Sequence, residues 1–400
     1  MTRNIKLILT TWCMALTTVF LFSCDDNMPN PDEKLKGNTV IVYMGAENSL
    51  YSLSNLDLDE MRTSRGSIPE DCQVVIYRDA ELKPAIFHLT KDGMSTWREF
   101  PEEQNSADPA TMKSILQDIV KGFPSEKYSL ILWSHGSGWI DEASNTRAII
   151  IDNQKNLADD MGPWISISQL SNMLSSLPHM EYIMFDACYM QSIEVAAELY
   201  PHTDYIIGSP TEIPGNGAPY NLIMQDLCTA DIQGIVDGYA SGYTGSSGVL
   251  LSAISCKDLP DFCTGTAKYI PKAFPKDNMP KIAGIQIYAP AYGNTDSKQG
   301  IMPVPYDMRS AMFRVLSNED YTAWEALWRK TILFPTQADS WITKYRTSKF
   351  GSFHCTMMDP EHYGGISMNI PNAEYDSKGW NEQFQQTQWY EKANWKQTDW

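Results

Sequence analysis

The chain has 400 residues, of which 43% are hydrophobic and 20% are charged, and its formal net charge is −18 at pH 7. This composition is ordinary for a globular protein and gives enough length for one or two domains. The acidic balance argues against nucleic acid as a partner and would attract cationic ligands, although solubility alone is the more usual reason for an acidic surface.

The first 23 residues have the pattern of a secretory signal. Arg3 and Lys6 precede an apolar stretch at 7–22, which is short for a membrane span. The Leu-x-Ser-Cys ending at Cys24 resembles a bacterial lipobox, which implies cleavage before Cys24 and diacylation of its sulfur. An ordinary signal with an incidental cysteine is the alternative. We therefore expect an exported protein, lipid-anchored to the bacterial cell envelope (periplasmic or cell surface), with residues 24–37 as a flexible tether.

Short apolar runs then alternate with helical patterns, which predicts an α/β fold around a mostly parallel sheet covered on both faces. The expected strands lie at 39–44, 72–77, 84–89, 128–134, 148–151, 182–186, 205–209 and 249–254. The expected helices lie at 49–61, 109–121, 166–177, 193–199, 232–243 and 258–270. The composition changes near residue 275, where prolines gather. We expect a first domain at 38–275 and a C-terminal α+β subdomain at 276–400, with strands at 282–288, 301–304 and 365–370.

Two of these strands end in residues that can do chemistry. The run at 128–134 leads into His135 and Gly136, and the run at 182–186 leads into Ala187 and Cys188. Ligands of open α/β sheets bind at the carboxyl ends of strands, and a cysteine needs a nearby base such as histidine to become a nucleophile. The separation of 53 residues is close to the His-to-Cys spacing of caspases.

A thiol nucleophile needs three supports. We expect the N-terminus of the helix after Cys188 to favour its thiolate, and His135 to protonate the leaving amine. The backbone N–H groups of Gly136 and Cys188 would face the oxyanion. Either side chain alone is more simply a buried strand-end cysteine or a histidine in a glycine turn, but their matched positions favour the catalytic interpretation.

The segments 132–139 and 186–190 resemble the clostripain family of cysteine peptidases, from the clan that also holds caspases, gingipains and legumain. Weaker similarities at 209–217 and 365–371 extend the likeness over roughly residues 38 to 390. The resemblance implies a caspase-like three-layer sandwich. It also implies a cysteine endopeptidase that uses a Cys-His dyad on protein or peptide substrates.

The resemblance further implies that Asp186 is a pocket acid that selects Arg or Lys before the scissile bond. A carboxylate there would pair with a guanidinium group through two hydrogen bonds, but a helix N-cap is an equally good interpretation of Asp186. Glu212 is a second pocket candidate, although a surface loop residue is the simpler interpretation. Gly217 is followed by Ala218, where family members usually have an aromatic residue, so the exact side-chain preference stays open.

Family members often cleave themselves at a basic residue between the histidine and the cysteine, and Arg147 and Lys155 are the candidates here, although both could be ordinary solvated residues. Some members need calcium, which the many acids permit. The sequence contains no standard metal-binding motif, and we expect no required cofactor. The alternative function is a non-catalytic surface lipoprotein that keeps the scaffold and binds a peptide or protein partner, as the altered loop after Gly217 would allow.

Overall fold

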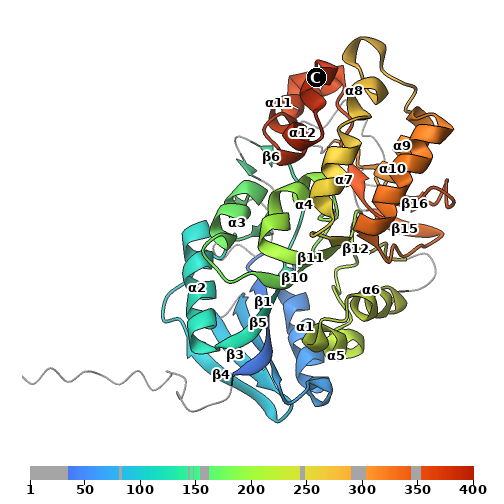
Figure 1. Cartoon of the computed structure of the whole chain (residues 1–400). Helices are drawn as coiled ribbons and strands as arrows, with labels where there is room; N and C mark the ends of the chain where they lie inside the picture. Colours follow the sequence, from blue (N-terminus) through green and yellow to red (C-terminus); the bar gives the residue numbers. More distant parts are fainter. Residues whose placement is uncertain are drawn as a thin grey trace, which may run out of the picture.

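A computed structural model describes residues 35–80, 83–142, 145–146, 148–153, 162–243, 248–289, 303–343 and 353–400. Its centre is a nine-stranded sheet in the order β14-β12-β11-β10-β5-β1-β2-β3-β4 (Figure 1). The predicted signal peptide, Cys24 and most of the predicted tether lie outside the described residues, as do Arg147 and Lys155.

The middle of the sheet is parallel, as the sequence predicts. Its strands are β2 (Cys72–Asp79), β1 (Lys36–Gly45), β5 (Ser125–Trp133), β10 (Met180–Asp186) and β11 (Thr203–Gly208). These strands are continuous apolar runs because the sheet is covered on both faces. The outer strands are antiparallel: β3 (Ala85–Thr90) and β4 (Gly93–Glu99) at one edge, β12 (Ser252–Ser255) and β14 (Ile332–Leu333) at the other.

Helices cover both faces and make three layers (Figure 1). Successive side chains of a strand point to opposite faces, so Val40 and Val42 of β1 pack on one side while Ile41 and Tyr43 pack on the other. The first side is covered by α1 (Tyr51–Thr63), α5 (Tyr220–Thr229) and α6 (Ile232–Ser241). The second is covered by α2 (Pro109–Gly122), α3 (Ile167–Leu174) and α4 (Ile193–Leu199).

Local sequence signals fix where several helices begin. Asp108 caps α2 by accepting the N–H of Thr111, with proline at the first helical position, as predicted. Ser166 starts α3 in a capping box with Gln169. Ser192 caps α4 by accepting the N–H of Val195.

The C-terminal third adds helices to the second face. These are α7 (Leu259–Thr266), α9 (Met308–Val315), α10 (Asn318–Thr331), α11 (Trp380–Phe384) and α12 (Gln388–Lys392). Trp324, Trp389 and Trp395 lie in the same apolar core as the strands, which is therefore continuous across residue 275. A domain boundary at that position stays a prediction.

A segment of this region also braces α4. The N–H of Ser367 donates to the carbonyl of Gln191 at 3.0 Å, and the N–H of Asn369 donates to Glu194 Oε1 at 2.8 Å. The strand predicted at 365–370 shrinks to β17 (Ser367–Met368) because these residues bond to α4 and its cap instead. The strand predicted at 282–288 does not form, and that stretch contributes a single bridge between Ile287 and Tyr306.

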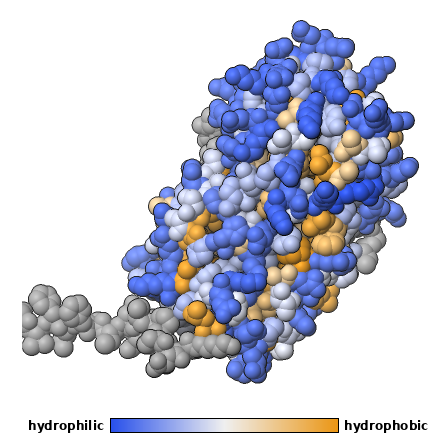
Figure 2. Space-filling model, in the orientation of Figure 1, coloured by the Kyte–Doolittle hydropathy of each residue, from blue (hydrophilic) through white to orange (hydrophobic). Residues whose placement is uncertain are grey.

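The surface seen in Figure 2 is mostly hydrophilic, with apolar residues in small groups. Within the part of the chain that the structure describes, no helix combines the length and apolarity needed to cross a membrane.

Candidate active site

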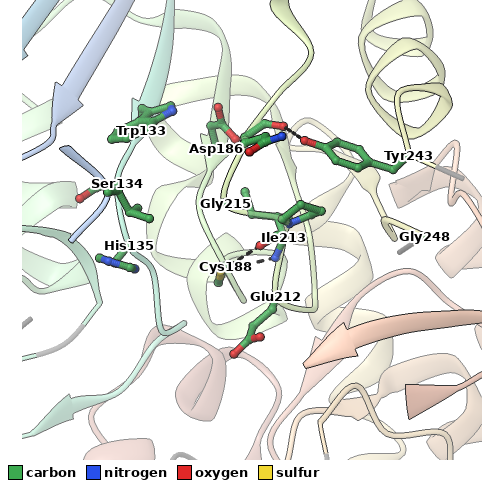
Figure 3. Close-up of a pocket in the computed structure, with 14 residues that line it drawn as sticks. Trp133, Ser134, His135, Asp186, Cys188, Glu212, Ile213, Gly215, Tyr243 and Gly248 are labelled. Carbon is green, nitrogen blue, oxygen red and sulfur yellow. Dashed lines mark hydrogen bonds between the residues drawn. The ribbon is translucent and has the colours of Figure 1, made fainter. Parts of the chain in front are cut away.

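The ends of β5 and β10 bring the predicted pair together. The two strands are parallel neighbours, and Trp133 is the register partner of Asp186. His135 and Cys188 each lie two residues beyond that pair, so both leave the sheet at the same edge. They line one cavity of about 590 Å³, in which Figure 3 shows the imidazole beside the sulfur.

The Cys188 side chain is half-buried, and a backbone donor faces its sulfur. The N–H of Ile213 lies 3.4 Å from Sγ. A hydrogen bond to sulfur favours the thiolate over the thiol. The expectation that a helix N-terminus supports Cys188 is wrong, because α4 begins only at Ile193 and the field of a helix terminus acts within its first turn.

His135 is contacted by residues from outside β5 and β10. Ser49 Oγ lies 3.0 Å from His135 Nε2, and the ring of Trp164 lies with its centroid 6.3 Å from that of the imidazole. Ser49 comes from the turn between β1 and α1. No sequence motif marks it, because its role depends only on the neighbouring positions of β1 and β5 in the sheet.

Gly136 packs against the backbone that carries Cys188. A Cβ atom at position 136 would lie 2.5 Å from the carbonyl oxygen of Cys188, so only glycine fits. Gly136 also forms an antiparallel bridge with Ile149, whose hydrogen bonds are made by the flanking residues. In such a pair the N–H of the central residue points away from the partner strand, which leaves the Gly136 N–H directed away from β8 (Ile149–Ile151).

Asp186 lies at the inner end of the cavity and is 3% exposed. Its Oδ2 accepts hydrogen bonds from Ala218 N–H at 3.0 Å and Tyr220 Oη at 2.9 Å, and its Oδ1 accepts one from Tyr239 Oη at 2.9 Å. The N-cap interpretation is wrong, since Ser192 caps the following helix. Burial raises the pKa of Asp186, and the three donors oppose that shift.

A second buried carboxylate, Asp57 of α1, lies next to Asp186. A Cβ atom built on Gly217 would lie 2.9 Å from Asp186 Oδ2 and 3.0 Å from Asp57 Oδ2, so this glycine fits between the two acids. Trp133 Nε1 donates to Asp57 Oδ2 at 2.6 Å. Burial, followed by repulsion from Asp186, raises the pKa of Asp57 to about 9.

Asp57 is not among the predicted site residues, although the sequence contains a signal for it. Ser54, Asp57 and Met61 form the buried face of α1, so an acid falls on the helical stripe that should be apolar.

Glu212 lines the cavity but does not join the two aspartates. Figure 3 shows its carboxylate at the opposite end from Asp186, with Cys188 between them. The sequence has no aromatic residue directly after Gly217, but the structure brings one to the cavity from elsewhere. Tyr243, two residues after α6, lines the cavity, and its hydroxyl donates to the Gly217 carbonyl. Ala218 is fully buried, and its backbone N–H donates to Asp186 Oδ2.

Among the described residues, one group of acids brings three possible metal ligands together: Glu47, Asp79 and Glu103. It lies outside the cavity lining.

Comparison with known proteins agrees with this arrangement. The clostripain family profile matches residues 42–400. Clostripain of Hathewaya histolytica is 25% identical over 221 residues, which cover 47% of this chain and 42% of that protein, so the match spans less than half of that relative. A secreted C11 cysteine protease from Bacteroides thetaiotaomicron, solved with an irreversible peptide inhibitor, has a TM-score of 0.74 at 25% identity, covering 90% of this chain and 99% of that chain.

The structure of an inactive zymogen C11 protease from Parabacteroides distasonis gives a TM-score of 0.75 at 24% identity, with coverage of 90% of this chain and 99% of that chain, and supports the fold. The three-layer arrangement around a mostly parallel sheet is thus the caspase-like fold of the C11 proteases. Because the family profile covers most of its length, the chain belongs to the clostripain family.

Proposed function

We propose that this protein is an exported cysteine endopeptidase that cleaves proteins or peptides after Arg or Lys. The observation that carries the proposal is a single cavity that joins Cys188 and His135 to a buried carboxylate at its inner end. A thiol beside an imidazole provides a nucleophile and an acid, and a buried carboxylate provides selectivity for a cation.

The reaction follows from the positions of the groups. The Cys188 thiolate attacks the scissile carbonyl carbon, and the N–H groups of Gly136 and Cys188 stabilise the oxyanion. His135 gives a proton to the leaving amine as the C–N bond breaks, and a thioester remains on the sulfur. His135 then takes a proton from water, which attacks the thioester, breaks the C–S bond and releases the acid product and the Cys188 thiolate. Side-chain and backbone groups suffice for these steps, so we propose no cofactor for the bond-breaking chemistry.

Two contacts prepare the pair before substrate arrives. The Ile213 N–H at 3.4 Å from Sγ stabilises negative charge on the sulfur. The Ser49 hydroxyl at 3.0 Å from Nε2 fixes the orientation of the His135 ring. Both contacts come from outside β5 and β10, so the dyad is held from the loop after β11 and the turn after β1.

Selectivity for a basic residue comes from the two aspartates. Asp186 is held by three donors and lies at the inner end of the cavity, with Asp57 directly behind Gly217. A guanidinium or ammonium group entering the cavity would pair with the buried Asp186 carboxylate and favour ionisation of Asp57, whereas a neutral side chain would leave the Asp186 charge without a cation. Glu212 at the outer end would contact a second basic group of the substrate.

The same proposal covers processing and location. Diacylation of Cys24 would anchor the chain to the cell envelope, and cleavage at Arg147 or Lys155 would open the segment between His135 and Cys188. A relative from Bacteroides thetaiotaomicron is a secreted protease, which supports export.

Thiol labelling and substrate profiling test the proposal together. Cys188→Ala should abolish cleavage of a peptide library in which wild type cuts after Arg or Lys, and iodoacetamide near pH 7 should label Cys188. Cys355 is the matched control: it is also half-buried, but burial and then Glu212 raise its pKa to about 11, so it should stay unlabelled and Cys355→Ala should stay active.

Three outcomes would contradict parts of the proposal. An inert wild type with an unreactive Cys188 would favour the non-catalytic binding protein. Cleavage after residues other than Arg and Lys would refute the pocket assignment. Identical fragments from wild type and Cys188→Ala would refute self-cleavage.

A further inference from the structure

Two buried cysteines meet at the edge of the sheet opposite the cavity. Cys72 begins β2, and Cys228 lies one residue before the end of α5, a helix that covers this face of the sheet. The two residues are 2% and 4% exposed. The cavity lies at the carboxyl ends of the parallel strands, so neither cysteine takes part in the chemistry described above.

A backbone contact holds the two positions together. Asn38 is the register partner of Cys72 in the β1–β2 pair, and its Nδ2 donates to the Cys228 carbonyl at 3.2 Å. Neighbouring strands are about 4.8 Å apart, so Cys228 is bound to the residue directly beside Cys72. Cα atoms of α5 and β2 approach within 8 Å of one another, which is close to the Cα separation of about 4.4–6.8 Å that a disulfide spans.

The two thiols also face each other. A hydrogen bond with the Cys72 side chain, followed by burial, raises the pKa of Cys228. The Tyr182 hydroxyl lies near both sulfurs, since burial and then Cys228 and Cys72 raise its pKa, and it donates to the Leu227 carbonyl at 2.9 Å. Two thiols share a hydrogen bond only where their side chains point toward each other, which is the arrangement that a disulfide requires.

We propose that Cys72 and Cys228 form a structural disulfide that joins β2 to α5. The setting rests on the proposed export, because disulfides form and persist in the oxidising compartments outside the cytosol. An apolar thiol pair in a compartment of that kind has no reducing pool to keep it open.

The oxidant is a disulfide-bearing molecule, and the bond forms by exchange. The thiolate of one cysteine attacks a sulfur of the oxidant, which forms a mixed disulfide and releases one thiol. The thiolate of the second cysteine then attacks the mixed disulfide and releases the other thiol. The two cysteines lose two protons and two electrons in total, and the oxidant gains them. Because burial makes the folded thiols inert, the exchange takes place during folding, before α5 closes over β2.

The bond would secure the end of α5 that lies away from the cavity. Tyr220 starts this helix and donates to Asp186, whereas Cys228 is near its last residue. The two cysteines are 156 residues apart in the sequence, and a cross-link that closes a long loop stabilises mainly by constraining the unfolded chain. We therefore expect the bond to raise stability and to leave the dyad unchanged.

Peptide mapping reads the bond directly. The chain is taken from the envelope of the producing bacterium, alkylated in denaturant without reductant, digested and analysed by mass spectrometry. We expect the peptides of Cys72 and Cys228 to be joined to each other, with the other four cysteines of the described chain alkylated. Alkylated Cys72 and Cys228, or a bond from either one to another cysteine, would overturn the proposal.

The pairing depends on the fold, so a refolding experiment tests it separately from export. The whole chain carrying Cys188→Ala is unfolded in reductant and refolded in reduced and oxidised glutathione, which supplies the external disulfide. The same linked peptides should appear, and a refolded chain that keeps both thiols would overturn the pairing. Neither readout uses peptidase activity, so the result does not depend on Cys188 being a nucleophile.

Melting measures what the bond contributes. Wild type should melt about 3–5 °C lower with a phosphine reductant than without it, because unfolding exposes the bond to reduction. Cys72→Ala should melt at one temperature in both conditions, and Cys228→Ala repeats the test if Cys72→Ala folds poorly. Cys263→Ala removes an equally buried thiol from α7 and should keep the full difference. Equal melting of wild type in the two conditions would overturn the stabilising role.

Discussion

Replacing Asp186 by asparagine isolates the charge at the inner end of the cavity. The carbonyl oxygen of asparagine can take the place of Oδ2, which accepts from Ala218 N–H and Tyr220 Oη. The amide nitrogen would then donate to Tyr239 Oη, since a hydroxyl can rotate to accept. Burial raises the pKa of Asp186, so losing its charge should not lower stability near neutral pH.

We expect Asp186→Asn to lower kcat/KM for basic substrates alone. Removing one partner of a buried charge pair costs about 2–5 kcal/mol, which is about 30-fold to several-thousand-fold in kcat/KM at 1.36 kcal/mol per factor of ten. Ionisation of Asp57 should make this loss of kcat/KM smaller. Repulsion from Asp186 helps to keep Asp57 protonated, so Asp57 ionises more easily in the variant and retains part of the attraction. We expect a loss near the lower end, and a larger one in Asp57→Asn/Asp186→Asn.

The assay compares two peptides that differ only in charge. One carries Arg before the scissile bond and the other citrulline, which has the same shape but is neutral. Wild type, Asp186→Asn, Asp57→Asn and the double variant are measured on both. Citrulline cleavage should change by less than about threefold, which is within the effect of an ordinary neutral substitution. Asp59→Asn is the matched control, because Asp59 lies on the same helix but is exposed and pairs with Arg62.

Equal losses on the Arg and citrulline peptides would refute the reasoning, since the defect would then be one of structure and not of charge. Unchanged Arg cleavage in the double variant would refute it as well, since neither aspartate would then contribute to selectivity.

Two further predictions concern the frame around the dyad. Gly136→Ala would place a Cβ atom 2.5 Å from the Cys188 carbonyl oxygen, and the resulting displacement of the loop that carries Cys188 should lower kcat/KM by about 100-fold. Gly66→Ala is the control and should retain activity, because no atom lies within 4 Å of a Cβ built there. Equal activity of the two variants would contradict the prediction. Burial raises the pKa of Glu194 to about 7. Because this is above its unfolded value, the free energy of unfolding should fall by about 3 kcal/mol as the pH rises from 4.5 to 7. Glu194→Gln still accepts the Asn369 N–H and should flatten this fall in melts at pH 5 and pH 8, whereas parallel profiles would exclude Glu194 as its source.

The sequence predicts the sheet centre and the dyad position because those features are local and repeated. Each strand is a continuous apolar run, and each run ends where its parallel neighbour ends, so His135 and Cys188 meet without knowledge of the loops. The supports of the dyad are not local. The Ile213 N–H and the Ser49 hydroxyl reach the site from other loops, and no periodicity reports such a contact.

Of the two acids at the inner end of the cavity, the sequence predicts Asp186 and not Asp57. Asp186 lies two residues before Cys188 in the sequence, whereas Asp57 lies 131 residues before Cys188, between two leucines of α1. The helix predicted at 193–199 forms with those bounds, and only its expected support of Cys188 is wrong, because Ser192 sets its start four residues after the cysteine. Two of the strands expected after residue 275 form only in part: the one at 365–370 shortens to β17, and the one at 282–288 contributes a single bridge to Tyr306, because the apolar residues there also pack against helices.

The brace on α4 has a consequence for how the protein is made. The N–H groups of Ser367 and Asn369 donate to Gln191 and Glu194, which follow Cys188 in the chain. The Gln388 N–H adds a bond to Glu198 Oε1 at 2.8 Å. A nascent chain that contains Cys188 but not yet Ser367, Asn369 and Gln388 lacks the hydrogen bonds that hold α4 in place. The hydrogen bonds that hold α4 are therefore complete only once the 200 residues after Cys188, as far as Gln388, have been synthesised.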